Sequence, residues 1–243
     1  MIEVKNITKS FGAHTALNNI TLRVENGMVY GLVGYNGAGK TTLLKIIAGV
    51  YSPNAGEVFI DKMLVHSARS SHKSLFIVAD EPYFLPQATP ETMRAFYKGY
   101  YPQWSDDVYE RMLALFKLNP LAKVTGFSKG MQRQLGILLG FATGATTMLL
   151  DESFDGLDLS KRNLLKRLLR QYAREKQAAV ILSSHNLREL EDAADHLGMI
   201  KECKLVFDGS VEEVHQQYPG ASLEEIFLSE GDGEVEDIEG LFL

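Results

Sequence analysis

Apolar and polar positions follow two patterns along the chain, and each predicts its own kind of β-strand. Residues 2–4 and 20–24 alternate apolar and polar side chains, as the half-buried strands of an antiparallel sheet do. Four later runs are almost entirely apolar, which is typical of parallel strands buried on both faces. They lie at residues 28–33, 75–79, 148–150 and 178–182. The sequence therefore predicts an N-terminal antiparallel β subdomain and a separate parallel sheet.

Helical periodicity occurs between the apolar runs. Leucines and isoleucines at 43, 44, 46 and 47 follow the first run, and leucines at 164, 165, 168 and 169 mark a helix over 161–175. Strands that alternate with helices in this way predict a doubly wound α/β core. Residues 88–143 break the alternation, because they read as helices with no strand between them. We expect an α-helical subdomain, about residues 84–143, inserted in that core.

Composition excludes several classes of protein. The 243 residues are 45% hydrophobic and 23% charged, as in ordinary globular chains. A single cysteine, Cys203, leaves no internal disulfide and no cysteine-based metal cluster, which fits a reducing cytoplasm. No apolar run reaches the roughly 18 residues of a membrane span, and the first residues do not resemble a signal peptide. We therefore expect a cytoplasmic protein that does not itself insert into the membrane.

The net charge of −6 comes from one end of the chain. Residues 230–243 contain six acids and no base, whereas residues 1–229 contain 25 acids and 25 bases. A body without basic excess argues against nucleic-acid binding. We expect residues 229–243 to form a solvated acidic tail. Within it, Leu241–Leu243 is an apolar exception suited to docking on a neighbouring surface.

A glycine-rich loop between the run at 28–33 and the next helix predicts nucleotide binding. It satisfies G-x-x-x-x-G-K-[ST] with Gly34, Tyr35, Asn36, Gly37, Ala38, Gly39, Lys40 and Thr41. Its glycines let the backbone turn so that N–H groups face phosphate oxygens, and the helix N-terminus adds the positive end of its dipole. Lys40 can reach the β- and γ-phosphates, while the Thr41 hydroxyl can bind Mg²⁺. The loop indicates a nucleoside triphosphate as ligand.

Two acids end the apolar run at 148–150. Asp151 and Glu152 lie at the carboxyl end of a strand, which is where ligands bind in an open α/β sheet. Asp151 is placed to hold Mg²⁺ through water, and Glu152 to orient or deprotonate the attacking water. A strand followed by two acids is a weak signal alone. It gains specificity here because it comes 111 residues after Lys40 and is followed by Gly156-Leu-Asp158.

Together these motifs resemble the ATP-binding subunit of ABC transporters, over about residues 1–228. Gly34–Thr42 matches the Walker A loop of the family, and Asp151 with Glu152 matches its Walker B pair. The other matches are Phe11 with the aromatic that stacks on adenine, Ser128, Lys129, Gly130 and Met131 with the signature motif, Gly156–Asp158 with the D-loop, and His185 with the switch histidine. The resemblance implies a P-loop NTPase (RecA-like) core, with ATP and Mg²⁺ as ligands.

The resemblance also implies a site shared between two chains. Ser128 and Gly130 precede an apolar run, so they begin a helix whose free N–H groups can bind phosphate. In the family this helix faces the γ-phosphate held by the opposite subunit, so two copies, identical or paralogous, enclose two ATP molecules. The same grounds assign Asp158 to the nucleotide and His185 to the γ-phosphate. Without the resemblance, Phe11 would be interpreted as a core residue.

Two departures from the family pattern are informative. The signature Phe127-Ser-Lys-Gly-Met131 replaces the commoner Leu-Ser-Gly-Gly-Gln, and it is similar to that of ABC-2-type ATPases, which energise export of peptides, antibiotics, lipids or polysaccharides. The Q-loop glutamine of the family should directly follow the run at 75–79, where this chain has Asp80. Asp80 is the candidate for the contact with Mg²⁺, and Gln87 is its rival.

The resemblance implies a motor that drives transmembrane permease subunits and is held by them at the inner face of the cell membrane. The segment 83–127 contains ten of the chain's 23 aromatic residues, and it is the expected receptor for the permease. The candidate contacts are Tyr83, Phe84, Tyr100, Tyr101 and Trp104. Core packing is the other interpretation of these aromatics.

Two further functions compete with the motor. One is a soluble ABC-type ATPase with a regulatory or assembly role and no membrane partner. The other is an unrelated P-loop kinase or GTPase, but the chain lacks a guanine-reading Asn/Thr-Lys-x-Asp motif. A P-loop kinase or GTPase would also leave Ser128-Lys-Gly130 unexplained.

Overall fold

The strands of the chain form two sheets in the computed structural model, which describes residues 1–65, 71–217 and 225–226. The first sheet is antiparallel and has the order β2-β1-β4-β5. Its strands are β1 (Ile2–Phe11), β2 (His14–Val24), β4 (Ala55–Ile60) and β5 (Met63–Leu64). Ile2 is paired with Val24 on one side and with Ile60 on the other, so the apolar positions of three strands share one face. The predicted antiparallel subdomain is confirmed.

The second sheet has six strands in the order β10-β9-β3-β8-β7-β6. They are β3 (Val29–Val33), β6 (Leu75–Val78), β7 (Thr147–Leu150), β8 (Ala179–Ser184), β9 (His196–Lys201) and β10 (Lys204–Ser210). Five of them are parallel, and β10 joins β9 as an antiparallel hairpin at one edge. The four predicted buried strands are all present, within two residues of the expected ends.

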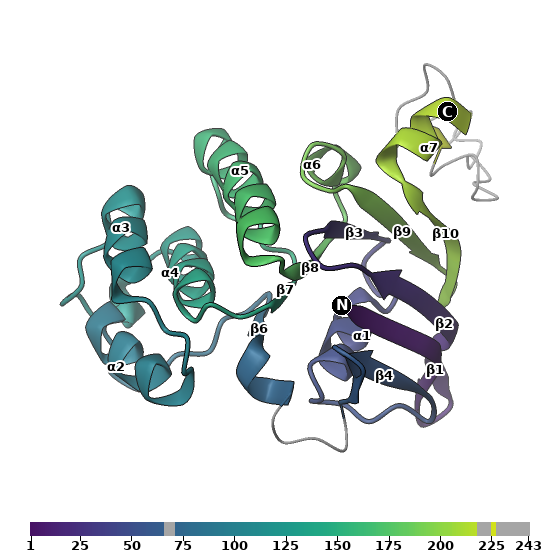
Figure 1. Cartoon of the computed structure of the whole chain (residues 1–243), viewed down its shortest axis with the longest axis horizontal. Helices are drawn as coiled ribbons and strands as arrows, with labels where there is room; N and C mark the ends of the chain where they lie inside the picture. The colour runs from purple at the N-terminus through teal and green to yellow at the C-terminus, as the bar shows by residue number, and fades with distance from the viewer. Residues whose placement is uncertain (66–70, 218–224, 227–243) are drawn as a thin grey trace, which may run out of the picture.

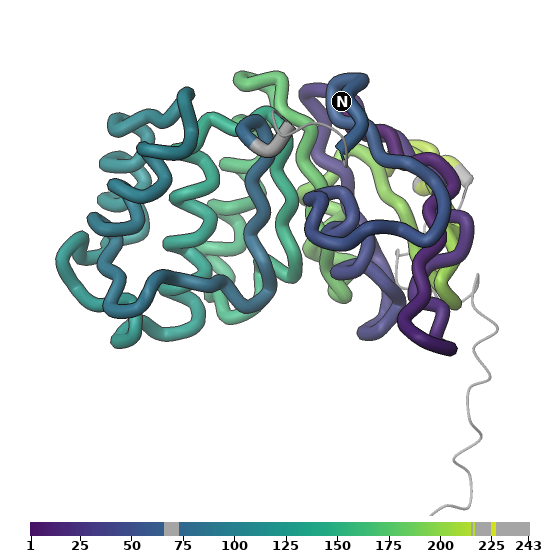
Figure 2. The backbone as a smooth tube through the Cα atoms, turned by 90° about the horizontal axis from the view of Figure 1, so that it is seen from below, coloured from purple at the N-terminus to yellow at the C-terminus, as the bar shows by residue number. Residues whose placement is uncertain are grey.

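The helices divide between the two faces of the second sheet and a separate helical part (Figure 1). They are α1 (Lys40–Ile47), α2 (Pro90–Tyr100), α3 (Asp106–Phe116), α4 (Lys129–Ala142), α5 (Leu159–Lys176), α6 (Leu187–Glu191) and α7 (Val211–Gln217), with short 3₁₀ turns at Ser71–Ser74 and Val124–Gly126. As expected, no strand is found among residues 88–143, all of which the structure describes. Figure 2 shows α2–α4 at one end of the molecule and the antiparallel sheet at the other.

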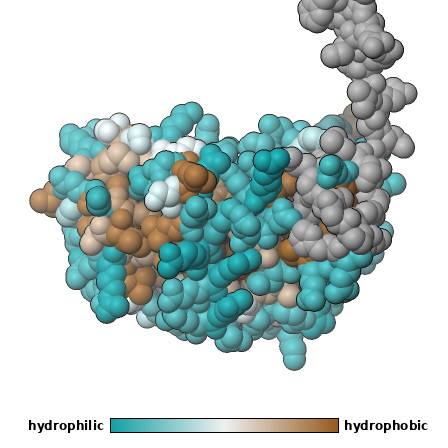
Figure 3. Space-filling model, turned by 90° about the horizontal axis from the view of Figure 1, so that it is seen from above, coloured by the Kyte–Doolittle hydropathy of each residue, from teal (hydrophilic) through white to brown (hydrophobic). Residues whose placement is uncertain are grey.

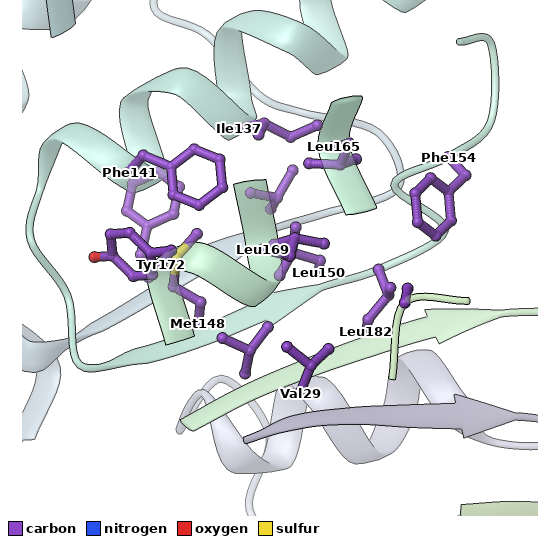
Figure 4. Packing of buried hydrophobic residues seen from close by; sticks show 14 of the residues in the cluster. Val29, Ile137, Phe141, Met148, Leu150, Phe154, Leu165, Leu169, Tyr172 and Leu182 are labelled. Atoms are coloured by element: carbon purple, nitrogen blue, oxygen red, sulfur yellow. The ribbon is translucent and has the colours of Figure 1, made fainter. Parts of the chain in front are cut away.

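Strand β7 separates two hydrophobic clusters. Leu149 belongs to a cluster with α1 and the antiparallel sheet, whereas Met148 and Leu150 belong to a cluster with α4 and α5. Figure 4 shows Leu150 beside Leu169 of α5, and Met148 beside Tyr172 of the same helix. Alternate residues of the strand therefore support opposite layers, which holds its carboxyl end firmly at the position where the acids follow.

Side-chain caps fix where the helices of the helical part begin. Thr89, Ser105 and Ser128 each accept a hydrogen bond from the backbone N–H three residues later. At the other end of α3, Lys117 takes a left-handed conformation, with φ of 55°. No helix among the described residues combines the length and the apolarity that a membrane crossing requires.

Candidate nucleotide site

The glycine-rich loop connects β3 to α1 and takes its shape from close backbone packing. Gly39 immediately precedes α1 with φ of 108°, a conformation that side chains rarely adopt. A Cβ atom at Gly39 would also lie 2.5 Å from the carbonyl oxygen of Ala16. Glycine is therefore required at Gly39 on two grounds. The loop delivers Lys40 as the first residue of α1, where backbone N–H groups have no partner within the helix.

Lys40 is buried and its ammonium group is surrounded by oxygen atoms. It donates hydrogen bonds to the carbonyl oxygens of Gly34 at 2.6 Å and Tyr35 at 3.3 Å. Its Nζ atom also lies 3.1 Å from Oε1 of Glu152, which forms an ion pair across the site. Lys40 and Glu152, predicted from separate motifs, are thus in direct contact.

Glu152 joins Lys40 to His185. Its second oxygen, Oε2, lies 2.9 Å from Nδ1 of His185 and accepts a hydrogen bond from the backbone N–H of the same histidine at 3.2 Å. The backbone of Glu152 has φ of 44°, in the left-handed region where non-glycine residues cost of the order of 1 kcal/mol or more. Two opposing partners, a cation and an imidazole, therefore fix the carboxylate of a residue with unusual backbone geometry.

Ser183 opens the switch-histidine motif Ser183–His185, but the sequence assigned it no role of its own. Its hydroxyl donates to Oδ1 of the buried Asp151 at 2.6 Å and accepts from the backbone N–H of Glu152 at 3.1 Å. The strand register explains this contact, because Leu150 of β7 is paired with Leu182 of β8 and the next residues lie side by side. That rule of parallel strands could have found Ser183 from the sequence.

Arg133 is a site residue that the sequence motifs missed. It lies on α4, is buried, and donates to the carbonyl oxygens of both Glu152 and Asp80. It also forms an ion pair with the Asp80 carboxylate at 2.8 Å. One guanidinium group therefore connects the helical part to the two segments that follow β6 and β7.

A cavity of about 290 Å³ brings nine of the predicted site residues together. Its lining consists of Phe11, His14, Ala16, Asn36, Gly37, Gly39, Lys40, Thr41, Thr42, Asp80 and Glu152. Phe11 is 46% exposed at the end of β1, where its ring contacts Lys9 and Tyr51, so it lies at the surface and not in the core. Asp80 lies in this lining and Gln87 does not, which favours Asp80 as the residue at the Q-loop position.

The signature and D-loop residues lie outside this cavity. Ser128 begins α4 and accepts a hydrogen bond from Met131, while Asp158 begins α5 and accepts one from Lys161. The two segments touch each other, because a Cβ atom at Gly130 would lie 2.4 Å from the carbonyl oxygen of Gly156. Lys129 lines a separate polar cavity of about 370 Å³ with Asp80 and Arg133. Within one chain, Ser128–Met131 and Asp158 form no part of the pocket that contains Lys40.

Comparison with known proteins agrees with this arrangement. The sequence profile described as "ABC transporter" matches residues 17–155. The lantibiotic transport ATP-binding protein SrtF of Streptococcus pyogenes is 30% identical over 230 residues, covering 93% of this chain and 96% of SrtF. The bacitracin transport ATP-binding protein BcrA of Bacillus licheniformis is 27% identical, covering 85% of this chain and 68% of BcrA.

Solved structures show the same fold. An ATP-binding subunit of an ABC transporter has a TM-score of 0.85 and 26% identity, covering 95% of this chain and 99% of that one. A dimeric ATP-binding cassette, MJ0796, bound to ADP and Pi, has a TM-score of 0.78 and 21% identity, covering 87% of this chain and 99% of MJ0796. The observed fold, a P-loop core with an antiparallel β part and a helical part, is thus the predicted fold. The chain belongs to the ABC transporter family and is one of its ATP-binding ATPase subunits.

Proposed function

We propose that the chain is the motor of an ABC-2-type exporter, and that it hydrolyses ATP as a head-to-tail dimer beneath transmembrane permease subunits. The contacts of Glu152 with Lys40 and with His185, beside the cavity that Lys40 and Glu152 line, are the observation that carries the proposal. The similarity to SrtF and BcrA, and the signature Phe127–Met131, support a peptide, an antibiotic or a lipid as cargo.

The predicted residues at and beside the cavity have proposed tasks in hydrolysis. Lys40 binds the β- and γ-phosphates, and Phe11 stacks on the adenine. Glu152 orients the attacking water and accepts its proton, because its carboxylate is held from two sides near the phosphate loop. His185 positions Glu152 and contacts the γ-phosphate. The remaining loop residues direct backbone N–H groups at the phosphates.

The donor set also suits Mg²⁺. Thr41 and Asp80 line the cavity, and Asp151 supplies a second carboxylate whose Oδ1 atom is already oriented by Ser183. Hydroxyl and carboxylate oxygens are the ligands that Mg²⁺ takes in proteins. When bound, the ion would neutralise charge on the phosphates.

The position of the signature motif supports a dimer. The N-terminus of α4 is suited to phosphate but is absent from the lining of the cavity with Lys40, as expected if a second chain supplies it. Two chains in head-to-tail orientation then give two equivalent sites. Ser128–Met131 and Asp158 of each chain complete the pocket of the other.

A mixing experiment tests the shared site. Ser128→Arg chains and Glu152→Gln chains should each be inactive alone, because one blocks the phosphate contact and the other removes the base. Their mixed dimer contains one pocket free of both changes, so ATPase activity should return on mixing. Activity that stays absent at every ratio, with both variants still binding ATP, would contradict the shared site.

Exposed aromatic residues support contact with a permease, although fewer than the sequence suggests. Tyr83 is 79% exposed and Tyr100 is 61% exposed. Phe84, Tyr101 and Trp104 instead pack against the core cluster, and the Tyr101 hydroxyl donates to the carbonyl oxygen of Leu75 at 2.9 Å. We propose Tyr83 and Tyr100 as the contacts of the permease.

Purification of the chain from detergent-solubilised membranes of its own cells tests this assignment. The unaltered chain should retain a membrane protein, as expected for a subunit held at the inner face. Changing Tyr83 and Tyr100 to Ala should release that protein while ATP binding and melting temperature stay unchanged. Trp104→Ala is the matched control, because loss of a core residue should lower the melting temperature. An unaltered chain found only in the soluble fraction would favour a regulatory ATPase.

A further inference from the structure

A third cavity lies between α3 and α5 and shares no lining residue with the two cavities described above. It measures about 380 Å³ and its floor includes Phe141 of α4 and Tyr172 of α5. The lining residues are Asp107, Val108, Arg111, Met112, Leu115, Phe141, Leu168, Gln171, Tyr172, Glu175 and Lys176. Figure 3 shows hydrophobic side chains gathered on this side of the molecule, where α2–α5 lie in Figure 1. We call this cavity the α3–α5 groove.

The helix along one wall of the α3–α5 groove is strongly basic. Helix α5 contains seven basic residues and one acidic residue, Glu175. Three of its bases face α6: Arg162 pairs with Glu189, Lys166 with Asp192 at 2.9 Å, and Arg170 donates to the carbonyl oxygen of Ala193.

Two arginines form the outer part of α5. Arg167 and Arg174 are seven residues apart, so they share one face of the helix, and both are exposed. This face lies between the residues directed at α6 and those that line the groove, such as Leu168. Neither arginine has an ion-pair partner among residues 1–65, 71–217 and 225–226. The acids at the groove already have partners, because Asp107 pairs with Arg111 and Glu175 accepts from Gln171.

The chain itself contains a segment of the complementary chemistry. Residues 230–243 carry six acids followed by Leu241, Phe242 and Leu243. The structure of residues 230–243 lies outside the described residues, but Ile226, shortly before them, is described. Ile226 is buried beside Leu187 of α6, the neighbour of α5. The 17 residues after Ile226 could extend over about 56 Å, twice the length of about 27 Å that an 18-residue helix such as α5 has.

We propose that residues 230–243 bind α5 and the α3–α5 groove of the same chain. The acids cross the outer face of α5 beside Arg167 and Arg174, and Leu241–Leu243 fill the groove. In the tail, the acids precede the apolar residues. On the path from α6, the two arginines of α5 likewise precede the apolar groove, so charge and apolar surface come in the same order in the tail and in its proposed receptor. The tail then connects α3 of the helical part to α5 of the core.

Cross-linking in the full-length chain tests the proposal. Leu115 lies in the groove and is 46% exposed, so Leu115→Cys with Phe242→Cys, in a Cys203→Ser background, places one thiol at each end of the contact. A short bis-maleimide should join them within one chain. The control pairs Phe242→Cys with Val206→Cys, an exposed position on β10 next to Phe207, which lines the same small cavity as Ile226.

The proposal predicts at least tenfold faster cross-linking to Cys at 115 than to Cys at 206, although the control site lies nearer to the start of the tail. Salt at 0.5 M, or Arg167→Glu with Arg174→Glu, should slow the reaction at least threefold, because the acids lose their partners. Equal rates at both positions would overturn the proposal. A cross-linked dimer as the main product would also overturn it, because the groove would then hold a second copy or its tail.

Hydrogen exchange gives an independent measurement without introduced cysteines. Amides of residues 108–115 and 168–176 should exchange more slowly in the unaltered chain than in a full-length variant with Ser at residues 241–243. The antiparallel sheet is the internal reference and should not change. Identical exchange of the two helices in both proteins would contradict docking of the tail.

Discussion

Replacing Arg133 should slow ATP turnover more than it weakens ATP binding. In the Arg133→Gln variant, the carbonyl oxygen of Glu152 loses its charged hydrogen-bond donor, while Lys40 and the phosphate loop keep every contact. A hydrogen bond to a charged group contributes about 1.5–3 kcal/mol. The ion pair with Asp80 adds little, because the Asp80 side chain is largely exposed and screened by water.

The size of the effect follows from that hydrogen bond. If its whole contribution serves to hold Glu152 in the reactive geometry, turnover falls by a factor of about 10 to 150. ATP affinity should change less than about threefold, since the phosphate contacts are unaltered. Lysine at Arg133 should not restore turnover, because a single ammonium group cannot reach the two carbonyl oxygens as the planar guanidinium does.

Steady-state ATPase assays, equilibrium binding of a fluorescent ATP analogue and thermal melting would measure these quantities together. Arg111→Gln is the control, because it removes an exposed arginine of the helical part that contacts no residue of the site. Our reasoning would be refuted if turnover were unchanged at saturating ATP while the melting temperature fell. Arg133 would then be a structural residue alone.

Two further predictions concern α4 and the start of α3. Gly130→Ala should lower dimer-dependent turnover but leave ATP binding intact, since its Cβ atom would lie 2.4 Å from the Gly156 carbonyl oxygen. Gly136→Ala is the control and should be neutral in the same assay, because the atom nearest to its Cβ would be 3.5 Å away. Hydrogen bonds from Lys98, Trp104 and Arg94 hold the pKa of Asp106 below its ordinary value of 3.8, so its stabilising contribution is present above that value and is lost as pH falls below it. Asp106→Asn should accordingly lower the melting temperature at pH 6 but much less at pH 2, and an equal difference at both would contradict the assignment.

Patterns in the sequence predicted the strands well where burial alone decides them. Thr147–Leu150 and Ala179–Ser184 are continuous apolar runs because both their faces are covered. The edge hairpin His196–Ser210 was harder, since its outer strand alternates exposed and half-buried residues along most of its length and contains three charged or polar side chains. Such a strand is defined by its neighbour more than by its own composition.

The site was predictable where its chemistry lies in side chains with a fixed spacing. Lys40, Glu152 and His185 were found from motifs, and the fold brings them into contact. Arg133 could not be found this way, because its partners are backbone carbonyl oxygens 19 and 53 residues away, and any residue type presents a carbonyl. Tyr100 and Tyr101 illustrate a similar limit. Tyr100 is exposed, whereas the adjacent Tyr101 packs against the core, and which of the two is buried depends on where α2 ends.

The ion pair between Lys40 and Glu152 has a consequence for the order of events in the site. In the proposed mechanism the γ-phosphate binds the same ammonium group, so it would compete with Glu152 for Lys40. Binding would then exchange one anion for another at Lys40 and leave the carboxylate to His185 and the attacking water. Substrate binding and release of the proposed base from Lys40 would thus be one event.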